Sequence, residues 1–560
     1  MSESSGLGPW AVETPVTQSM TTRDGQRLDA DVYRPHGAGP WPVLLMRQPY
    51  GRAIASTVCY AHPAWYASHG YVVVVQDVRG RGGSQGEFTP FETEQSDGEE
   101  TIAWAAALAG SNGAVGLYGF SYQGSNQLLA AASGAAALRA MAPAMLGWDL
   151  RADWACENDA PLLAANIEWA VQLAAGNALR AGDMPLHRDL CAAARVTPVH
   201  DDVPARPAVL ERARRYHHYF DWLDEPASSS YWARTSPHAQ AEKWLPQAPP
   251  ALFVGGWFDT HLRGSVNAHA AFTHAGRHDA RLLIGPWPHF PWGRRLGDCD
   301  FGNAAIGTVD DLQRRWFDHW LKGATAPAAS WNALRLFDLG RHQWLDLDTW
   351  PTDTAALCLH SGGRAALDES DGRLLFAPAA GEAFDWLVHD PWRPTPTFGG
   401  PWGTPNGPVY RTAIDGRSDV LTYTSDPLRE PLTVVGSPIV TLDVQTQAPS
   451  FDLHAVLSSV DENGRSLSLT EGYRHFPSHP QGAATLSLRP TCVTFFRGER
   501  IRLSIAAACF PAFAVNPGDG TRPSDARAGT HRVITLTIRH GGTSRSALNL
   551  PLQDRGRIHD

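Results

Sequence analysis

The sequence predicts an α/β core that is interrupted by a helical insertion and followed by an all-β domain. Apolar runs rich in β-branched residues alternate with helix-like stretches in the first part of the chain, which is typical of a parallel sheet covered by helices. Strand-like runs then vanish between residues 148 and 235. Beyond residue 355, apolar and polar residues alternate with turn residues between the runs, which indicates a β-sandwich of jelly-roll type.

The predicted core covers residues 1–147 and 236–354 and opens with a hairpin around Asp24-Gly25. Helices are predicted over 97–110, 121–134 and 309–323, the last with an apolar stripe and a glycine at its end. The predicted buried strands are PVLLMR (42–47), YVVVVQD (71–77), AVGLYGF (114–120), ALFVGGWFD (251–259) and RLLIGPWPH (281–289).

The insertion, residues 148–235, is predicted to consist of helices and loops with breaks at prolines such as Pro185. Asp149, Asp153 and Glu157 recur every four residues, so a helix would align them on one face. We interpret this acidic stripe as a solvated face, with a binding site for a substrate ammonium group as the alternative.

The all-β domain is predicted over residues 355–560. Its clearest strand patterns alternate apolar and polar residues. They are SPIVTLDV (437–444), ERIRLSIAAACF (499–510) and HRVITLTIRH (531–540).

Composition narrows the choice of partners and compartment. The chain is 43% hydrophobic with a net charge of −10 and no long basic block, which argues against nucleic acid or a membrane surface as a partner. No stretch approaches the roughly 20 apolar residues of a membrane span, and the first 16 residues show no signal-peptide pattern. The seven cysteines are scattered without a C-x-x-C pair, so we expect neither a disulfide framework nor structural zinc, and predict a cytoplasmic protein.

A serine between glycines, in YGFSYQG (118–124), is the first candidate for chemistry. Ser121 follows a predicted buried strand and precedes a predicted helix, which is the context of the nucleophile turn in α/β hydrolases. Its spacing departs from the usual G-x-S-x-G, because Gly124 stands three residues after the serine. A buried structural serine is the alternative on this evidence alone.

Two later strands supply partners for Ser121 in the required order of acid and then histidine. Asp259 ends one predicted strand and His289 follows the next, and side chains at the carboxyl ends of parallel strands gather at one edge of the sheet. His289 would take the proton of Ser121, and Asp259 would orient the imidazole. The backbone N–H of Tyr122 would donate to the oxyanion.

Two other motifs carry weaker signals. RGRGGSQG (79–86) is glycine-rich after a strand, but it lacks the G-K-[ST] ending and the third glycine of nucleotide-binding loops. We interpret its glycines as tight turns beside the active site. YHHYFD (216–221) has adjacent histidines that would point to different helix faces, so we predict solvated surface and no metal site.

Residues across nearly the whole chain resemble the CocE/NonD hydrolases, the family of cocaine esterase and X-prolyl dipeptidyl-peptidase. GFSYQG matches the G-x-S-Y-x-G form of the nucleophile turn in that family. Further matching segments are RQPYGR (47–52), QDVRGRGGSQGEF (76–88), GGWFD (255–259), GPWPH (285–289) and HDPWRPTPTFGG (389–400). The resemblance implies an α/β-hydrolase core with an inserted helical cap and a C-terminal jelly roll.

The resemblance also assigns residues that patterning does not. It implies that the hydroxyl of Tyr50 is the second oxyanion donor. Relatives that hydrolyse α-amino acid esters carry acidic residues two and three positions after the catalytic aspartate, where this chain has His261 and Leu262. That difference weakens recognition of a substrate amine. Trp257, Phe258 and Trp287 flank the predicted acid and base, and we expect them to contact the substrate.

We therefore predict a serine hydrolase that cleaves a small-molecule ester, or an amide, through an acyl-enzyme and without cofactor or metal. Alternatives are an X-prolyl dipeptidyl-peptidase or a β-lactam or α-amino acid ester acylase of the same family, and an acyltransferase. From another class, a non-catalytic binding protein could retain the fold. The sequence leaves the oligomeric state open, including a homo-oligomer.

Overall fold

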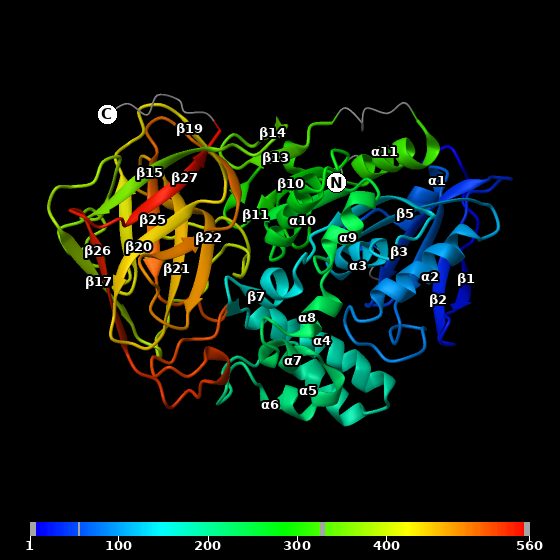
Figure 1. Ribbon diagram of the computed structural model, residues 1–560, viewed down its shortest axis with the longest axis horizontal. Coiled ribbons are helices and arrows are strands. Elements are labelled where there is room, and N and C mark those ends of the chain that lie inside the picture. The colour runs from blue at the N-terminus through cyan, green and yellow to red at the C-terminus, as the bar shows by residue number, and fades with distance from the viewer. Residues whose placement is uncertain (1–6, 54–56, 308, 325–330, 554–560) are drawn as a thin grey trace.

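The computed structural model describes residues 7–53, 57–307, 309–324 and 331–553. An α/β unit and an all-β unit lie side by side, with a group of helices below the α/β unit in the view of Figure 1. Within the described ranges, no helix combines the length and apolar character that a membrane crossing requires.

A ten-stranded sheet forms the centre of the α/β unit, and its strand order is β1-β2-β4-β3-β5-β6-β9-β10-β13-β14. The strands from β4 to β13 in this order are parallel, and antiparallel pairs close both edges. The parallel sheet predicted from the buried apolar runs is therefore present. Its strands are β1 (Val16–Thr21), β2 (Arg27–Tyr33), β3 (Trp41–Gln48), β4 (Val72–Asp77), β5 (Ser111–Phe120), β6 (Leu138–Ala144), β9 (Leu252–Phe258), β10 (Arg281–Pro288), β13 (Leu334–Asp338) and β14 (Gln343–Leu347).

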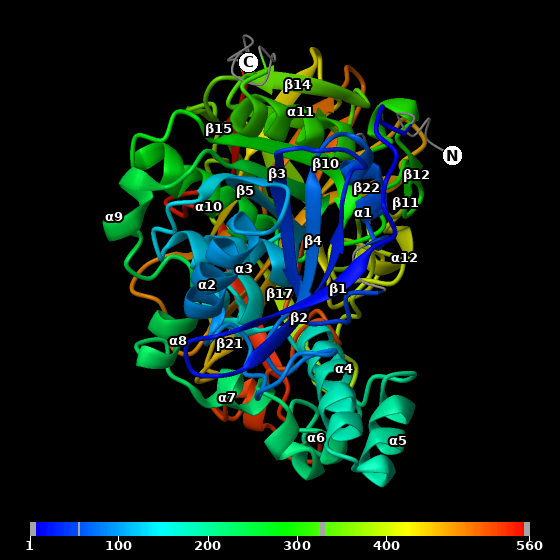
Figure 2. The ribbon, with the colours of Figure 1, turned by 90° about the vertical axis from the view of Figure 1, so that its right-hand side faces the viewer.

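Helices cover both faces of this sheet (Figure 2). Successive residues of β3 alternate between two hydrophobic cores: Val43 and Leu45 belong to one, Leu44 and Met46 to the other. The first core includes side chains of α2 (Glu94–Ala106), α3 (Tyr122–Ala131) and α10 (Leu262–His274). The second includes those of α1 (Pro63–Ser68) and α11 (Val309–Lys322).

The stretch before β9 contains the inserted helices. Pro185 does not break a helix there, because it lies in the first turn of α5, where the missing N–H would have no intrahelical partner. Two short strands, β7 (Cys156–Glu157) and β8 (Ala160–Pro161), were not predicted. The helices are α4 (Ala164–Arg180), α5 (Met184–Ala193), α6 (Ala208–Arg212), α7 (Tyr219–Asp224), α8 (Ser230–Thr235) and α9 (Ala241–Trp244).

The acidic stripe predicted as a solvated helix face is wrong on both counts. A π-helical turn, Arg151–Ala155, leads directly into β7, so Asp153 and Glu157 do not share a helix face. Asp153 is 4% and Glu157 2% exposed. Glu157 tolerates this burial because Arg489 and Arg263 lie within ion-pair distance of its carboxylate.

The all-β unit contains the predicted alternating strands, and the three clearest patterns fall on β20, β25 and β26. In β26, every second residue from Ile534 to His540 is buried. Strands of this unit are β15 (Asp353–His360), β16 (Arg373–Leu375), β17 (Ala383–His389), β18 (Leu421–Ser425), β19 (Leu432–Gly436), β20 (Ile439–Gln445), β21 (Phe451–Val460), β22 (Ser466–Phe476), β23 (Ala484–Ser487), β24 (Thr491–Phe495), β25 (Arg500–Ala506), β26 (Ile534–His540) and β27 (Ala547–Leu552). A short helix, α12 (Thr412–Asp415), and the two-residue strands β11 (Arg295–Leu296) and β12 (Cys299–Asp300) complete the principal elements.

Candidate active site

Ser121 lies on a strained turn between β5 and α3. Its φ of 63° and ψ of −126° are rare for a residue with a side chain, and such strain is typical of functional turns. Steric crowding explains why glycines occupy two positions near Ser121. A Cβ on Gly119 would lie 2.6 Å from the Cβ of Gln123, and one on Gly124 would lie 2.4 Å from the carbonyl oxygen of Ala144 in β6. The unusual glycine spacing therefore matches the packing of α3 against the sheet.

Asp259 and His289 lie at the carboxyl ends of the adjacent parallel strands β9 and β10. The Nδ1 atom of His289 is 2.8 Å from Oδ1 of Asp259. Burial of Asp259 opposes its ionisation, but the hydrogen bond and charge of His289 hold the pKa of Asp259 below its ordinary value. The ring of Phe120, the residue before Ser121, lies 5.4 Å from that of His289, which brings the serine turn beside this pair.

Tyr50 follows β3 by two residues and faces the same edge of the sheet. Its hydroxyl accepts the indole N–H of Trp169 at 3.1 Å. Desolvation raises the pKa of Tyr50 to about 12, although hydrogen bonds from Trp169 and from the side chain of Ser121 oppose the increase. The phenol therefore stays protonated near neutral pH and can donate a hydrogen bond beside the serine.

The side chain of Tyr122 is held away from Ser121, so only its backbone N–H is available beside the serine. Its hydroxyl donates to Glu94 at 2.8 Å and accepts the N–H of Phe91 at 3.1 Å. Arg47 forms a buried ion pair with Glu94. Tyr122 is the first residue of α3, where backbone N–H groups have no intrahelical acceptor. That N–H is thus fixed next to Ser121.

The three aromatic residues predicted to contact substrate lie in the protein interior. The indole N–H of Trp257 donates to the carbonyl of Phe337, and that of Trp287 donates to the carbonyl of Ala305. Trp257, Phe258 and Trp287 are each at most 3% exposed and belong to the two sheet cores. Core packing accounts for all three.

A different aromatic cluster adjoins Tyr50, and sequence reasoning missed it. Trp169 lies 5.0 Å from Trp154 between ring centroids, and Trp154 lies 4.1 Å from His261. Trp222 contacts both tryptophans. These tryptophans come from the insertion, where no motif marked them, and the abundance of 21 tryptophans was the only signal.

His261 approaches the Asp259–His289 pair without joining it. Its ring stands edge-on to that of His289 at 5.1 Å, and its Nδ1 lies 3.3 Å from the carbonyl oxygen of Asp153. Burial lowers the pKa of His261 to about 4. His261 is therefore a neutral ring packed against Trp154.

The prediction that the YHHYFD segment is solvated is wrong. His217 and His218 are 9% and 4% exposed, and the ring of His218 lies 4.5 Å from those of Trp169 and Trp222. His217 accepts the N–H of Tyr219 and contacts the carbonyl of Leu210. Among the described residues, no group of three or more His, Cys, Asp or Glu side chains is arranged to hold a metal ion.

The all-β unit reaches the site through Arg489, which is 1% exposed. Its guanidinium donates to the backbone carbonyls of Asp259 and Thr260 and to the carboxylate of Glu157 at 2.9 Å. Arg489 therefore ties the turn that carries Asp259 to both the insertion and the all-β unit.

Comparisons with known proteins cover almost the whole chain. Residues 24–291 match the family model "X-Pro dipeptidyl-peptidase (S15 family)", and residues 330–548 match its "C-terminal non-catalytic domain". The chain is 31% identical over 554 residues to a cocaine esterase of Rhodococcus sp., covering 92% of this chain and 93% of that protein. It is 27% identical to a putative serine esterase of Mycobacterium bovis, covering 89% of this chain and 91% of that protein.

Solved structures share the fold. An aminopeptidase of a marine sediment Thaumarchaeota archaeon superposes with a TM-score of 0.78 at 21% identity, covering 98% of this chain and 97% of the other. An α-amino acid ester hydrolase superposes with a TM-score of 0.76 at 23% identity, covering 96% and 97%. At these identities the likeness establishes the architecture, an α/β-hydrolase core with an insertion and a C-terminal all-β domain.

Proposed function

Because the chain belongs to the CocE/NonD family of serine hydrolases, we propose that it cleaves a carboxylic ester through an acyl-enzyme on Ser121. The observation that carries this proposal is the Asp259–His289 hydrogen bond at the strand ends beside the strained serine turn. Amide cleavage and transfer of the acyl group to an acceptor other than water are variants of the same chemistry.

Each group has one role in the proposed reaction. His289 removes the proton of Ser121 as its oxygen attacks the carbonyl carbon, and then returns that proton to the departing alcohol. Asp259 holds the imidazole and stabilises its charged form. Water then attacks the acyl-enzyme with His289 again as base, which releases the acid and restores the serine.

The oxyanion of each tetrahedral intermediate would lie between two donors. They are the hydroxyl of Tyr50 and the N–H of Tyr122. Both are fixed before substrate arrives, Tyr50 by Trp169 and Tyr122 by the start of α3. Donors held in place in this way strengthen their bonds as charge develops on the oxygen.

We propose uncharged acyl groups as the preferred substrates. The half-buried ring of Trp169 offers aromatic surface beside Tyr50, whereas His261 is neutral and Leu262 is buried in the core. Glu157 is already paired with two arginines, so it does not offer a free charge to an ammonium group. This arrangement speaks against the X-prolyl peptidase and α-amino acid ester acylase alternatives.

Two further expectations belong to this proposal. A reducing cytoplasm suits the seven cysteines, which all lie in the described part of the chain and are all free thiols. The functional units would be the core (1–147 and 236–354), the cap (148–235) and the jelly roll (355–560), with no nucleic acid or membrane as a partner.

A fluorophosphonate probe tests the proposal, because only an activated serine is labelled. Purified protein should gain one label on the peptide that contains Ser121, and it should hydrolyse p-nitrophenyl esters. Ser121→Ala should lose the label and roughly 10⁴-fold or more in kcat. Ser133→Ala, at the end of the same helical stretch, is the matched control and should behave as wild type. Equal labelling of Ser121→Ala would show that another residue is the nucleophile.

A further inference from the structure

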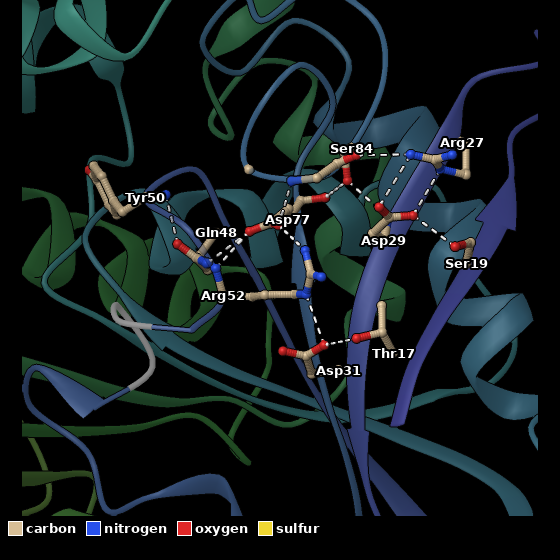
Figure 3. Close-up of polar contacts among 12 residues, drawn as sticks. Thr17, Ser19, Arg27, Asp29, Asp31, Gln48, Tyr50, Arg52, Asp77 and Ser84 are labelled. Carbon is tan, nitrogen blue, oxygen red and sulfur yellow. Dashed lines mark hydrogen bonds and ion pairs between the residues drawn. The ribbon is translucent and has the colours of Figure 1, made fainter. Parts of the chain in front are cut away.

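The glycine-rich segment that follows β4 wraps around one buried carboxylate, that of Asp77 (Figure 3). Asp77 is the last residue of β4 and is 1% exposed. Its Oδ1 accepts the backbone N–H of Arg52 at 2.7 Å and the side-chain amide of Gln48 at 3.3 Å. Its Oδ2 accepts the N–H of Gly83 at 3.0 Å and the guanidinium of Arg52 at 2.5 Å.

The glycines of this segment allow the close approach to Asp77. Gly82 has a φ of +50°, and a Cβ there would lie 2.1 Å from Oδ2 of Asp77. A Cβ on Gly83 would lie 2.9 Å from the guanidinium of Arg52. The segment therefore encloses a side-chain carboxyl group of the protein itself.

Asp77 holds the chain on both sides of Tyr50. Gln48 links Asp77 to the backbone of Tyr50. Its Oε1 accepts the backbone N–H of Tyr50 at 2.7 Å, and its Nε2 donates to Asp77. Arg52 is fixed two residues further along. Between them, Gly51 has a φ of +99° and no atom within 4 Å of where a Cβ would be, so packing does not restrain it.

Arg81 of the glycine-rich segment holds Pro49, the residue before Tyr50, and also contacts an inserted helix. Nε of Arg81 donates to the carbonyl of Pro49 at 2.7 Å, and its NH1 donates to Asn177 at 2.8 Å. Asn177 lies on α4, the helix that also carries Trp169. The backbone of Tyr50 is thus held through Gln48 and Asp77, and its hydroxyl is held by Trp169 of α4.

We propose that Asp77 and Gln48 are positioning residues for the oxyanion donor: they place the backbone of Tyr50 so that its hydroxyl meets the developing negative charge. This inference rests on the proposed function. A displacement of about 1 Å in a positioned group can cost on the order of 100-fold in rate. Loss of the restraint should therefore lower kcat and leave KM nearly unchanged, because the donor acts mainly in the transition state.

The experiment compares Asp77→Asn with Asp31→Asn in the full chain. Asp31 is the matched control, because its carboxylate also binds Arg52, at 2.9 Å, and no hydrogen bond joins it to Gln48 or to the backbone of residues 48–52 in the described contacts. Asp77→Asn should lower kcat on a p-nitrophenyl ester by about 10- to 100-fold. Asp31→Asn should change kcat by no more than about twofold, because an ion pair that is partly exposed to solvent contributes little energy.

A double-mutant cycle separates positioning from general damage. In a Tyr50→Phe background, Asp77→Asn should cause little further loss of kcat, since the donor it positions is gone. The same full loss in both backgrounds, or an equal loss in Asp31→Asn, would overturn the positioning role. Gln48→Met repeats the test through the other residue and serves if Asp77→Asn does not fold.

The outcomes also separate this inference from the proposed function. Tyr50→Phe with unchanged kcat would remove the oxyanion role of Tyr50 and the inference with it. A large loss in Tyr50→Phe that adds to the loss in Asp77→Asn would overturn the inference alone.

Discussion

Trp169 of the inserted helix α4 donates its indole N–H to the hydroxyl of Tyr50 across 3.1 Å. An indole N–H can only donate, so the phenol oxygen must accept in this contact, and its single hydrogen is left for another acceptor. Trp169 thereby orients the proton that an oxyanion would receive. The insertion therefore supplies a side chain that contacts the proposed oxyanion donor.

Tyr50→Phe should lower kcat by about 10²- to 10³-fold, which corresponds to roughly 3 kcal/mol for one oxyanion donor. KM should change little, because the bond strengthens only as charge develops on the carbonyl oxygen. Steady-state kinetics on one p-nitrophenyl ester measures both constants. A change confined to KM would make Tyr50 a binding aromatic instead.

Trp169→Phe should keep the aromatic surface and remove the N–H that orients Tyr50. We expect a smaller loss than in Tyr50→Phe, about fivefold in kcat, because a neutral hydrogen bond contributes about 1 kcal/mol. In the Tyr50→Phe background the same change should have no effect on kcat. A loss of equal size in that background would mean that Trp169 acts through packing.

His261→Phe should retain most of the activity, because the ring of His261 packs against Trp154 and makes no hydrogen bond with Asp259 through its side chain among the described contacts. His289→Ala should lose most of it. Wild-type kcat/KM should rise with pH, since an imidazole acts as a base only when neutral. Loss of turnover in His261→Phe with retention in His289→Ala would reverse the assignment of the base.

His261→Phe should also change how the folding stability depends on pH in the acid range. Burial lowers the pKa of His261 from 6.5 to about 4, so the unfolded chain binds more protons than the native state between these values. Stability is therefore lost as pH falls through this window, and His261→Phe should reduce that loss. Urea midpoints of wild type and variant at pH 7.5 and 5 measure the difference. An equal loss of stability between the two pH values in both proteins would contradict the buried, neutral state of His261.

A phenylacetyl ester should be a better substrate than the phenylglycyl ester with the same leaving group. An unpaired ammonium costs several kcal/mol to desolvate, and the carboxylates nearest the site are buried or already paired. The measurement is kcat/KM at a pH where the amine is protonated. A clear preference for the phenylglycyl ester would refute the prediction, and Asp149, Asp153 and Glu157 would then be tested by charge-removing substitutions.

Sequence patterns predicted the elements whose signals are local. Ser121, Asp259 and His289 were chosen as candidates because each follows a buried apolar run, and strand ends are readable from such runs. Tyr50 has no local signal, and its proposed role came from family resemblance alone. The five-residue strand β13 and its edge partner β14 were missed, because short strands carry little pattern.

The errors in the cap have a common physical cause. Glu157 and the His217–His218 pair look like surface residues in sequence, since charged and imidazole groups are usually exposed. Their burial depends on partners far away in the chain. Arg489, which binds Glu157, lies 332 residues beyond it, and no local pattern reports such a contact.

Arg489 also connects the all-β unit to the candidate active site. Its guanidinium supports the backbone of the turn that bears Asp259, so a chain lacking the all-β unit would keep the serine, the acid and the histidine but lose a support for the acid. It would also leave Glu157 with one arginine in place of two. The all-β unit is in this sense part of the hydrolase, and heat inactivation is expected to follow whichever of the two units melts first.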